Sequence, residues 1–157
     1  MPTDFTKDAC DLLDADHIAV KHLFVEYARQ AVAMPQEAGD RQALAERICQ
    51  ELTVHAQIEE EIFYPALRQA ISRPELLDEA IAEHQQAKDL IAQIQGMRAP
   101  DPQMDDLVAQ LASAIEHHVK EEREDLFTKA RVAPGLDLVA LAGQLKARQE
   151  ELMGMPA

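Results

Sequence analysis

Two stretches of this chain follow the same pattern, His55-Ala-Gln-Ile-Glu59 and His118-Val-Lys-Glu-Glu122. A helix turns by about 100° per residue, so a histidine and a glutamate four residues apart lie on one helical face. Each stretch is preceded in its half of the chain by a further histidine, His17 or His84. Together these residues offer four imidazoles and two carboxylates, which is a ligand set for a pair of transition-metal ions.

Composition places the chain in the all-α class. Its 157 residues include 5 Gly and no Trp, and Ala, Leu, Glu and Gln are abundant. This length predicts a single domain over residues 1–157. The net charge of −14 argues against binding to nucleic acid or to an anionic membrane, because a polyanion would be repelled.

The sequence also favours a cytoplasmic location. The N-terminus lacks the apolar core of a signal peptide, and no stretch approaches the roughly 20 apolar residues of a membrane span. Cys10 and Cys49 are far apart and fit neither a CxxC motif nor a disulfide framework. We predict that both cysteines are small buried residues rather than ligands or redox partners.

Periodicity and breakers predict five helices, over residues 8–34, 40–72, 74–97, 102–132 and 137–152. Asp40 is expected to cap the second helix, and Asp101-Pro102 to open the fourth. Residues 72–75, Ser-Arg-Pro-Glu, read as a capping box for the third. Pro65 should kink the second helix or remove one hydrogen bond, but the apolar pattern continues beyond it.

Each of the first four helices has one apolar face with alternating spacings of three and four residues. Short connections make neighbouring helices antiparallel, which predicts an up-down-up-down four-helix bundle over about residues 9–132. A short C-terminal helix, about residues 136–153, follows it. The predicted faces are Leu13, His17, Val20, Phe24, Tyr27 and Ala31; Ile48, Leu52, His55, Glu59, Ile62 and Ala66; Leu77, Ile81, His84, Ala87 or Lys88, and Ile91; and Val108, Leu111, Ile115, His118 and Glu122.

The two halves of the chain resemble each other. Asp16-His17-x-x-x-Lys21 matches Glu83-His84-x-x-x-Lys88, and residues 55–64 match residues 118–127. The chain therefore reads as two helical hairpins related by a pseudo-two-fold axis, each supplying two histidines and one glutamate. Counting residues from the loops brings all six groups within two helical turns of one level.

This convergence favours a metal site over a set of ordinary core histidines. Two buried carboxylates facing four imidazoles would be unfavourable by several kcal/mol unless a cation compensated them. Other polar residues close by are predicted to face solvent: His22, His117 and Glu121, and the acids Glu60, Glu61, Glu124 and Asp125.

Mixed imidazole and carboxylate ligands suit Fe, Mn or Zn, and the lack of thiolates disfavours a structural zinc site. Six ligands shared by two ions leave open coordination positions. Iron that binds O2 or peroxide is the first choice, with manganese or a mixed Fe/Mn pair behind it. A ferritin-like carboxylate bundle is rejected because it needs Glu-x-x-His pairs, and here the order is reversed and the spacing wider.

With these residues, the chain resembles the hemerythrin-like, or HHE cation-binding, domain family of the bacterial stand-alone type. The resemblance covers about residues 9–132 and rests on Asp-His, HxxxEE with Phe-Tyr-Pro, Glu-His, and HHxxxE with Leu-Phe. It implies a four-helix bundle around a non-haem di-iron centre bridged by two carboxylates and an oxo or hydroxo group. The implied ligands are His17, His55, Glu59, His84, His118 and Glu122, with Glu59 and Glu122 bridging.

Oxygen-carrying members of this family have a fifth histidine four residues after the one in the third helix, where this chain has Lys88, and Asp in place of Glu122. The missing imidazole argues against reversible O2 carriage. The parallel placement of Lys21 predicts that Lys88 points off the apolar face.

Three functions remain in competition at this stage. The first is a di-iron protein that binds or reacts with O2, peroxide or NO, in a catalase-like cycle between diferrous and diferric states. The second is an oxygen-, redox- or iron-sensing or iron-handling module without turnover, and the third is a purely structural metal bundle. The C-terminal helix could pack on the bundle, bind a partner or form a homodimer, and packing is favoured.

Overall fold

The computed structural model describes residues 7–35, 37–97 and 102–154, and the regular elements in these ranges are all helical. They are α1 (Ala9–Ala33), α2 (Ala38–Ile58), the π-helical segment η1 (Glu59–Phe63), α3 (Tyr64–Ala70), α4 (Pro74–Gln95), α5 (Pro102–Glu121), the π-helical segment η2 (Glu122–Phe127), α6 (Thr128–Val132) and α7 (Leu138–Leu152).

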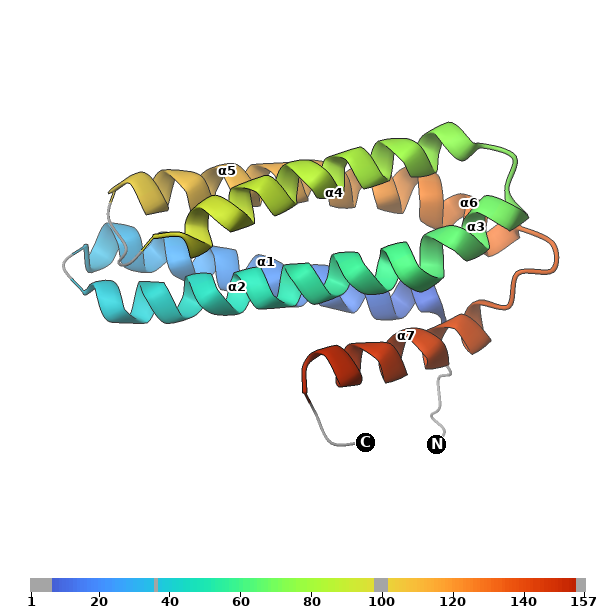
Figure 1. Cartoon of the computed structure of the whole chain (residues 1–157), viewed down its shortest axis with the longest axis horizontal. Helices are drawn as coiled ribbons and strands as arrows, with labels where there is room; N and C mark the ends of the chain where they lie inside the picture. Colours follow the sequence, from blue (N-terminus) through green and yellow to red (C-terminus); the bar gives the residue numbers. More distant parts are fainter. Residues whose placement is uncertain (1–6, 36, 98–101, 155–157) are drawn as a thin grey trace.

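Four long rods make up the bundle. Residues 58 and 59, like 121 and 128, keep helical backbone angles at the element boundaries, so α2, η1 and α3 form one rod and α5, η2 and α6 another. With α1 and α4 these rods run up-down-up-down, as the sequence predicts (Figure 1).

The helix ends follow the predictions only in part. Asp8 caps α1 through a capping box with Asp11. Asp40 was expected to cap α2 but lies in its first turn, because the helix begins earlier, after Glu37. The predicted capping box at Ser72 does not form: the capping position before Pro74 is Arg73, which makes no side-chain capping bond.

The fourth helix begins at Pro102, as expected. The predicted role of Asp101 falls outside the described residues.

The π-helical segment η1 shifts the apolar face of its rod by one residue. In η1 the amide of Tyr64 bonds to the carbonyl of Glu59, five residues back, so one extra residue is accommodated in the turn. Phe63 and Leu67 are therefore fully buried, whereas Ile62 and Ala66, which a continuous α-helical register places in the core, are only half-buried.

Pro65 lies two residues after the end of η1, but a proline is not a feature that the two π-helical segments share. Thr128 holds the matching position after η2, and its hydroxyl donates to the carbonyls of Glu124 and Asp125. The common feature is the glutamate of each His-x-x-x-Glu pair at the start of the segment. The prediction of a continuous rod through Pro65 is confirmed, and the register after it is corrected.

The buried face of α4 differs from the predicted one at Ile81. Ile81 was placed on the buried face but is 38% exposed, whereas its neighbour Ala80 is 4% exposed. The true face of this helix runs through Leu77, Ala80, His84, Ala87, Ile91 and Ile94.

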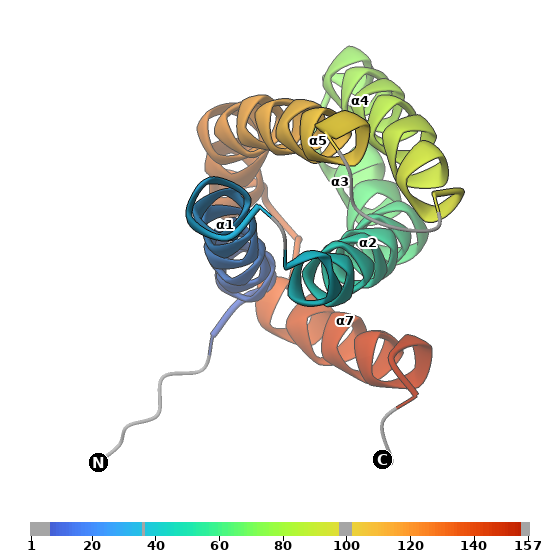
Figure 2. The same ribbon diagram turned by 90° about the vertical axis from the view of Figure 1, so that its left-hand side faces the viewer.

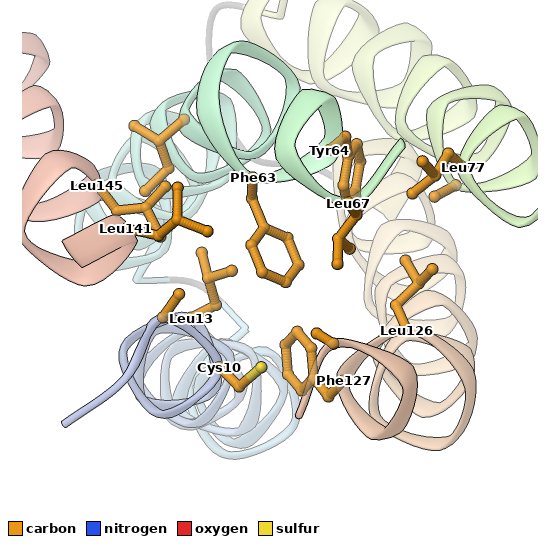
Figure 3. Close-up of a cluster of buried hydrophobic side chains, with 14 of the residues drawn as sticks. Cys10, Leu13, Phe63, Tyr64, Leu67, Leu77, Leu126, Phe127, Leu141 and Leu145 are labelled. Carbon is orange, nitrogen blue, oxygen red and sulfur yellow. The ribbon is translucent and has the colours of Figure 1, made fainter. Parts of the chain in front are cut away.

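The apolar core is divided into two clusters, and the six candidate ligands belong to neither of them. One cluster gathers around Phe63 and Phe127 at the end where α3, α6 and α7 meet (Figure 3). The other occupies the opposite half of the bundle and includes Phe24, Ile48 and Leu111. A buried polar layer therefore lies where a four-helix bundle usually has its continuous core.

The C-terminal helix α7 packs on the bundle, as favoured from the sequence. It lies against α1 and α2 (Figure 2), and Leu141 and Leu145 insert into the cluster around Phe63 (Figure 3). Within the described ranges, none of the helices combines the length and the apolar character needed to cross a membrane.

Substitutions at two adjacent positions test the shifted register of η1. We expect Phe63→Ala to lower the free energy of unfolding by about 3–5 kcal/mol, because it empties a fully buried site. Ile62→Ala should cause a smaller loss, since Ile62 is half-buried. Urea unfolding of both variants measures the difference, and a larger loss for Ile62→Ala would contradict the π-helical register.

The two cysteines are predicted to be unreactive in the folded chain. Both are buried and free, Cys10 in one core cluster and Cys49 in the other. Burial raises the pKa of the Cys10 thiol to about 12 and that of Cys49 to about 11, so little thiolate exists at pH 8. A disulfide reagent should label neither thiol in native protein and both in urea. Rapid native labelling at pH 8 would contradict this packing.

Candidate metal centre

The six residues predicted as ligands come together in the buried polar layer. His17 lies on α1, His55 on α2 and Glu59 at the start of η1, while His84 lies on α4, His118 on α5 and Glu122 at the start of η2. The histidines are 5–7% exposed and the glutamates 0–1% exposed. Four rods therefore bring six polar side chains out of contact with solvent.

The histidines form two pairs, one in each helical hairpin. The Nε2 atoms of His17 and His55 are 3.1 Å apart, and those of His84 and His118 are also 3.1 Å apart. The rings of each pair meet edge to face, with centroids 4.8 and 4.7 Å apart. All four Nε2 atoms thus point into the interior of the bundle.

Each glutamate reaches a histidine of both pairs. Glu59 Oε1 lies 3.4 Å from Nε2 of His55 and 3.0 Å from Nε2 of His84. Glu122 lies 3.0 Å from Nε2 of His17 through Oε1 and 3.4 Å from Nε2 of His118 through Oε2. Two carboxylates that span two imidazole pairs have the arrangement of bridging ligands between two cation positions.

The donor atoms fit cations better than they fit one another. Two Nε2 lone pairs 3.1 Å apart repel unless a positive charge lies between them. Glu59 Oε2 is fully buried and has no hydrogen-bond partner among the described residues. Buried anionic oxygens without partners are strongly unfavourable, and a bound cation supplies what they lack.

The electrostatics of the centre point the same way. Burial opposes the imidazolium of His118, but hydrogen bonds to Glu122 and Glu83 raise its pKa to about 10. Burial likewise opposes the charge of His55, yet Glu59 and Asp16 raise its pKa well above the ordinary value. Protons and metal ions therefore compete for the same buried negative potential.

The Nδ1 atom of every imidazole contacts a carboxylate. These four groups, the outer carboxylates, are Asp14, Asp16, Glu60 and Glu83. A carboxylate only accepts, so Nδ1 carries the proton and Nε2 is left free to bind a cation. The contacts are His17 Nδ1 to Asp14 Oδ1 (3.3 Å), His55 Nδ1 to Asp16 Oδ2 (3.1 Å), His84 Nδ1 to Glu60 Oε2 (2.7 Å) and His118 Nδ1 to Glu83 Oε1 (2.7 Å).

The sequence carried a signal for two of the outer carboxylates. An acid directly precedes a histidine in both halves, in Asp16-His17 and Glu83-His84, and each acid serves the histidine of the neighbouring helix. Asp14 and Glu60 have no acidic counterpart in the other half. Glu60 was predicted to lie on a solvated face, and its contact with His84 corrects that prediction.

Tyr64 also belongs to the centre, and the sequence analysis assigned it no role. It is 1% exposed, and its hydroxyl donates to Glu122 Oε2 at 2.5 Å or Glu59 Oε1 at 3.2 Å. The same oxygen lies 3.3 Å from Nε2 of His84 and 3.4 Å from Nε2 of His118. Burial and the two carboxylate charges raise the pKa of Tyr64 well above 10.0, so the hydroxyl keeps its proton unless a cation displaces it.

Comparison with known proteins identifies a cation-binding family. The model of the hemerythrin HHE cation binding domain matches residues 8–130. The chain belongs to this family. A crystal structure of an HHE cation binding domain-containing protein from Mycobacterium kansasii, a homolog of Rv2633c, is similar with a TM-score of 0.75 and 26% identity, over 94% of this chain and 88% of that chain.

Two sequence relatives differ in how much of their length this chain matches. The uncharacterized protein Rv2633c of Mycobacterium tuberculosis is 28% identical over 154 residues, which is 95% of this chain and 89% of that protein. A DNA nickase of Nostoc sp. is 32% identical over 124 residues, or 77% of this chain. The matched region is 33% of the nickase, so the likeness concerns one part of that protein.

Three residues predicted to lie outside the centre of this HHE domain do so: His22, His117 and Lys88. His22 is exposed, and His117 is exposed by 66% in its side chain, where it faces Glu83 and Glu121 at the surface. Lys88, which stands where oxygen carriers have a fifth histidine, points off the buried face and binds Glu60 Oε1 at 3.0 Å.

The pseudo-two-fold symmetry of the centre fails at Tyr64, because Phe127 holds the corresponding position after the second repeat. Phe127 stacks on His17 with centroids 6.1 Å apart, and Tyr64 stacks on His84 at 5.4 Å. The two histidine pairs therefore have different neighbours, one with a hydroxyl and one without.

Removing the Tyr64 hydroxyl should destabilise the metal-free protein. We expect Tyr64→Phe to lower its free energy of unfolding by about 1–3 kcal/mol, because Glu122 loses a buried donor while the ring volume is kept. In metal-loaded protein the loss should be smaller, since a cation then occupies the carboxylates. Urea unfolding with and without metal measures both values, and equal losses in the two forms would contradict the proposed contact between carboxylates and cation.

Proposed function

We propose that this HHE domain is a cytoplasmic di-iron protein that binds and reacts with a small oxidant, with peroxide as the first candidate and O2 or NO as alternatives. The observation that carries the proposal is a small apolar cavity beside all four histidines. When bound, an iron pair would supply redox-active centres with open coordination positions.

The cavity has a volume of about 30 Å³, which exceeds the roughly 10–15 Å³ that one water molecule needs. All four candidate histidine ligands line it, together with apolar side chains that include Leu52, Ile91 and Val119. Leu52 and Ile91 belong to the core cluster opposite to Tyr64, so the cavity and the hydroxyl approach the histidines from different ends of the bundle. Such a space favours a small ligand over one of metabolite size.

The residues of the chain have distinct roles in this proposal. Glu59 and Glu122 would bridge the two ions, because each reaches both histidine pairs. The outer carboxylates hold the imidazole tautomers, and the core clusters on both sides exclude bulk water. The Tyr64 hydroxyl oxygen lies 2.5 Å from Glu122 Oε2, so its proton would be held beside a bridging carboxylate.

The donor set favours iron, with manganese or a mixed Fe/Mn pair as the nearest alternatives. Four imidazoles and two carboxylates include no thiolate, and neither cysteine approaches the centre as a ligand among the described residues. Six donors shared between two ions leave positions free, which suits reactivity better than a closed structural site.

Iron loading and peroxide decay test the proposal together. We expect anaerobically loaded protein to hold two Fe per chain and to consume peroxide faster than the same amount of free iron. His55→Ala should reduce iron content and peroxide turnover, because it removes one donor and the imidazole that Asp16 orients. Metal analysis and the absorption spectrum after reduction and re-oxygenation provide the measurement.

His22→Ala is the matched control, since His22 is an exposed histidine on the same helix as His17. It should leave iron content and turnover unchanged. Peroxide decay no faster than with free iron, and equal in wild type and His55→Ala, would overturn the enzymatic proposal. Two Fe per chain with no turnover would instead favour the sensing or iron-handling alternative.

A further inference from the structure

The outer carboxylates are each held by one more side chain, and one of these side chains comes from α7. Three outer carboxylates face a basic residue of the bundle, and the fourth, Asp16, accepts a hydrogen bond from Gln149. The contacts are Arg123 Nε to Asp14 Oδ1 (2.5 Å), Lys88 Nζ to Glu60 Oε1 (3.0 Å), His117 Nε2 to Glu83 Oε2 (3.4 Å) and Gln149 Nε2 to Asp16 Oδ2 (3.0 Å).

The contact of Gln149 joins α7 to a candidate ligand through a single atom. Asp16 Oδ2 accepts from Gln149 Nε2 at 3.0 Å and from His55 Nδ1 at 3.1 Å. A cavity of about 200 Å³ adjoins this contact and is lined by Asp16 and Gln149 themselves. Without Gln149, the carboxylate of Asp16 has room to turn toward this cavity and away from His55.

A second polar contact from α7 reaches the segment that carries Glu59. Arg148 Nε binds Glu61 Oε1 at 2.8 Å, and Glu61 belongs to η1. These polar contacts and the insertion of Leu141 and Leu145 into the core bring α7 against both rods of the first hairpin. The helix therefore lies against the outer side of the His17–His55 pair, and its other face is exposed.

We propose that Gln149 is a positioning residue for His55, so that docking of α7 and cation binding at the His17–His55 pair stabilise each other. A bound cation fixes the Nε2 of His55, which holds its Nδ1–H on Asp16 and keeps Asp16 aligned with Gln149. Coupling of this kind is reciprocal: whatever binds the metal centre tightens α7, and whatever displaces α7 weakens the centre. This inference rests on the proposed metal binding, but not on any reaction with peroxide.

Amide hydrogen exchange of α7 tests the coupling with Fe²⁺ alone as the probe. Anaerobic addition of Fe²⁺ to wild type should slow exchange in residues 138–152 by roughly fivefold, a common size for coupling between two sites. Gln149→Ala should keep α7 docked through Leu141 and Leu145 but lose this metal-dependent slowing. It should also release Fe²⁺ to a chelator at least about threefold faster.

Two variants of α7 serve as comparisons. Gln144→Ala removes an exposed glutamine of the same helix and should behave like wild type in both measurements. Gln149→Lys gives Asp16 a basic partner, as Asp14 and Glu60 have, and should restore the wild-type release rate. A role limited to helix stability would not produce this rescue together with the loss in Gln149→Ala.

The outcomes separate this inference from the proposed function. Wild type that binds two Fe²⁺ while α7 exchanges at the same rate with and without metal would overturn the coupling alone. Gln149→Ala with an unchanged metal-dependent slowing and release rate would do the same. Wild type that binds no Fe²⁺ would overturn both the proposed function and the coupling.

Discussion

The structure depends on the placement of two carboxylates and four imidazoles in the dry middle of a helical bundle. Such groups are strongly unfavourable there without compensation, because buried oxygens such as Glu59 Oε2 have lost their hydration. Positive charge between the donor atoms resolves the conflict, whether protons or metal ions provide it. The protein belongs to a cation-binding family, and its geometry explains why cations would be needed.

The rest of the bundle is organised around this layer. The apolar core is split into two clusters, one on each side, and each acts as a wall that keeps water from the donor atoms. Each rod that supplies a glutamate widens into a π-helical turn at that glutamate. Such turns are frequent at functional sites, and here η1 also decides which side chains after Glu59 face the core.

The two halves of the centre are alike in their donors and different in their surroundings. Repeated sequence places equivalent histidines and glutamates on both hairpins, which accounts for the symmetric pairs. The asymmetry comes from Tyr64 opposite Phe127, from the outer residues Asp14 and Glu60, and from α7, which packs mainly on the first hairpin. Two ions held by such a centre would differ in hydrogen bonding and in access to a proton.

Much of this architecture followed from the sequence alone, for a local reason. Helical period, proline and glycine breaks and short connections are properties of neighbouring residues, and they predicted four antiparallel rods, a fifth helix and six converging side chains. The geometric convergence of those six is observed in the structure, while their role as metal ligands stays a prediction. The repeat Asp16-His17 and Glu83-His84 also held a usable signal for two outer carboxylates.

Other features were decided only by tertiary structure, because they depend on distances between rods. The π-helical turns moved the buried face from Ile62 to Phe63, which no periodicity within one helix could show. Tyr64 became part of the centre through that shift, and Glu60 met His84 across helices instead of facing water. The link from Gln149 to His55 joins residues almost a hundred positions apart, so only the packing of α7 could reveal it.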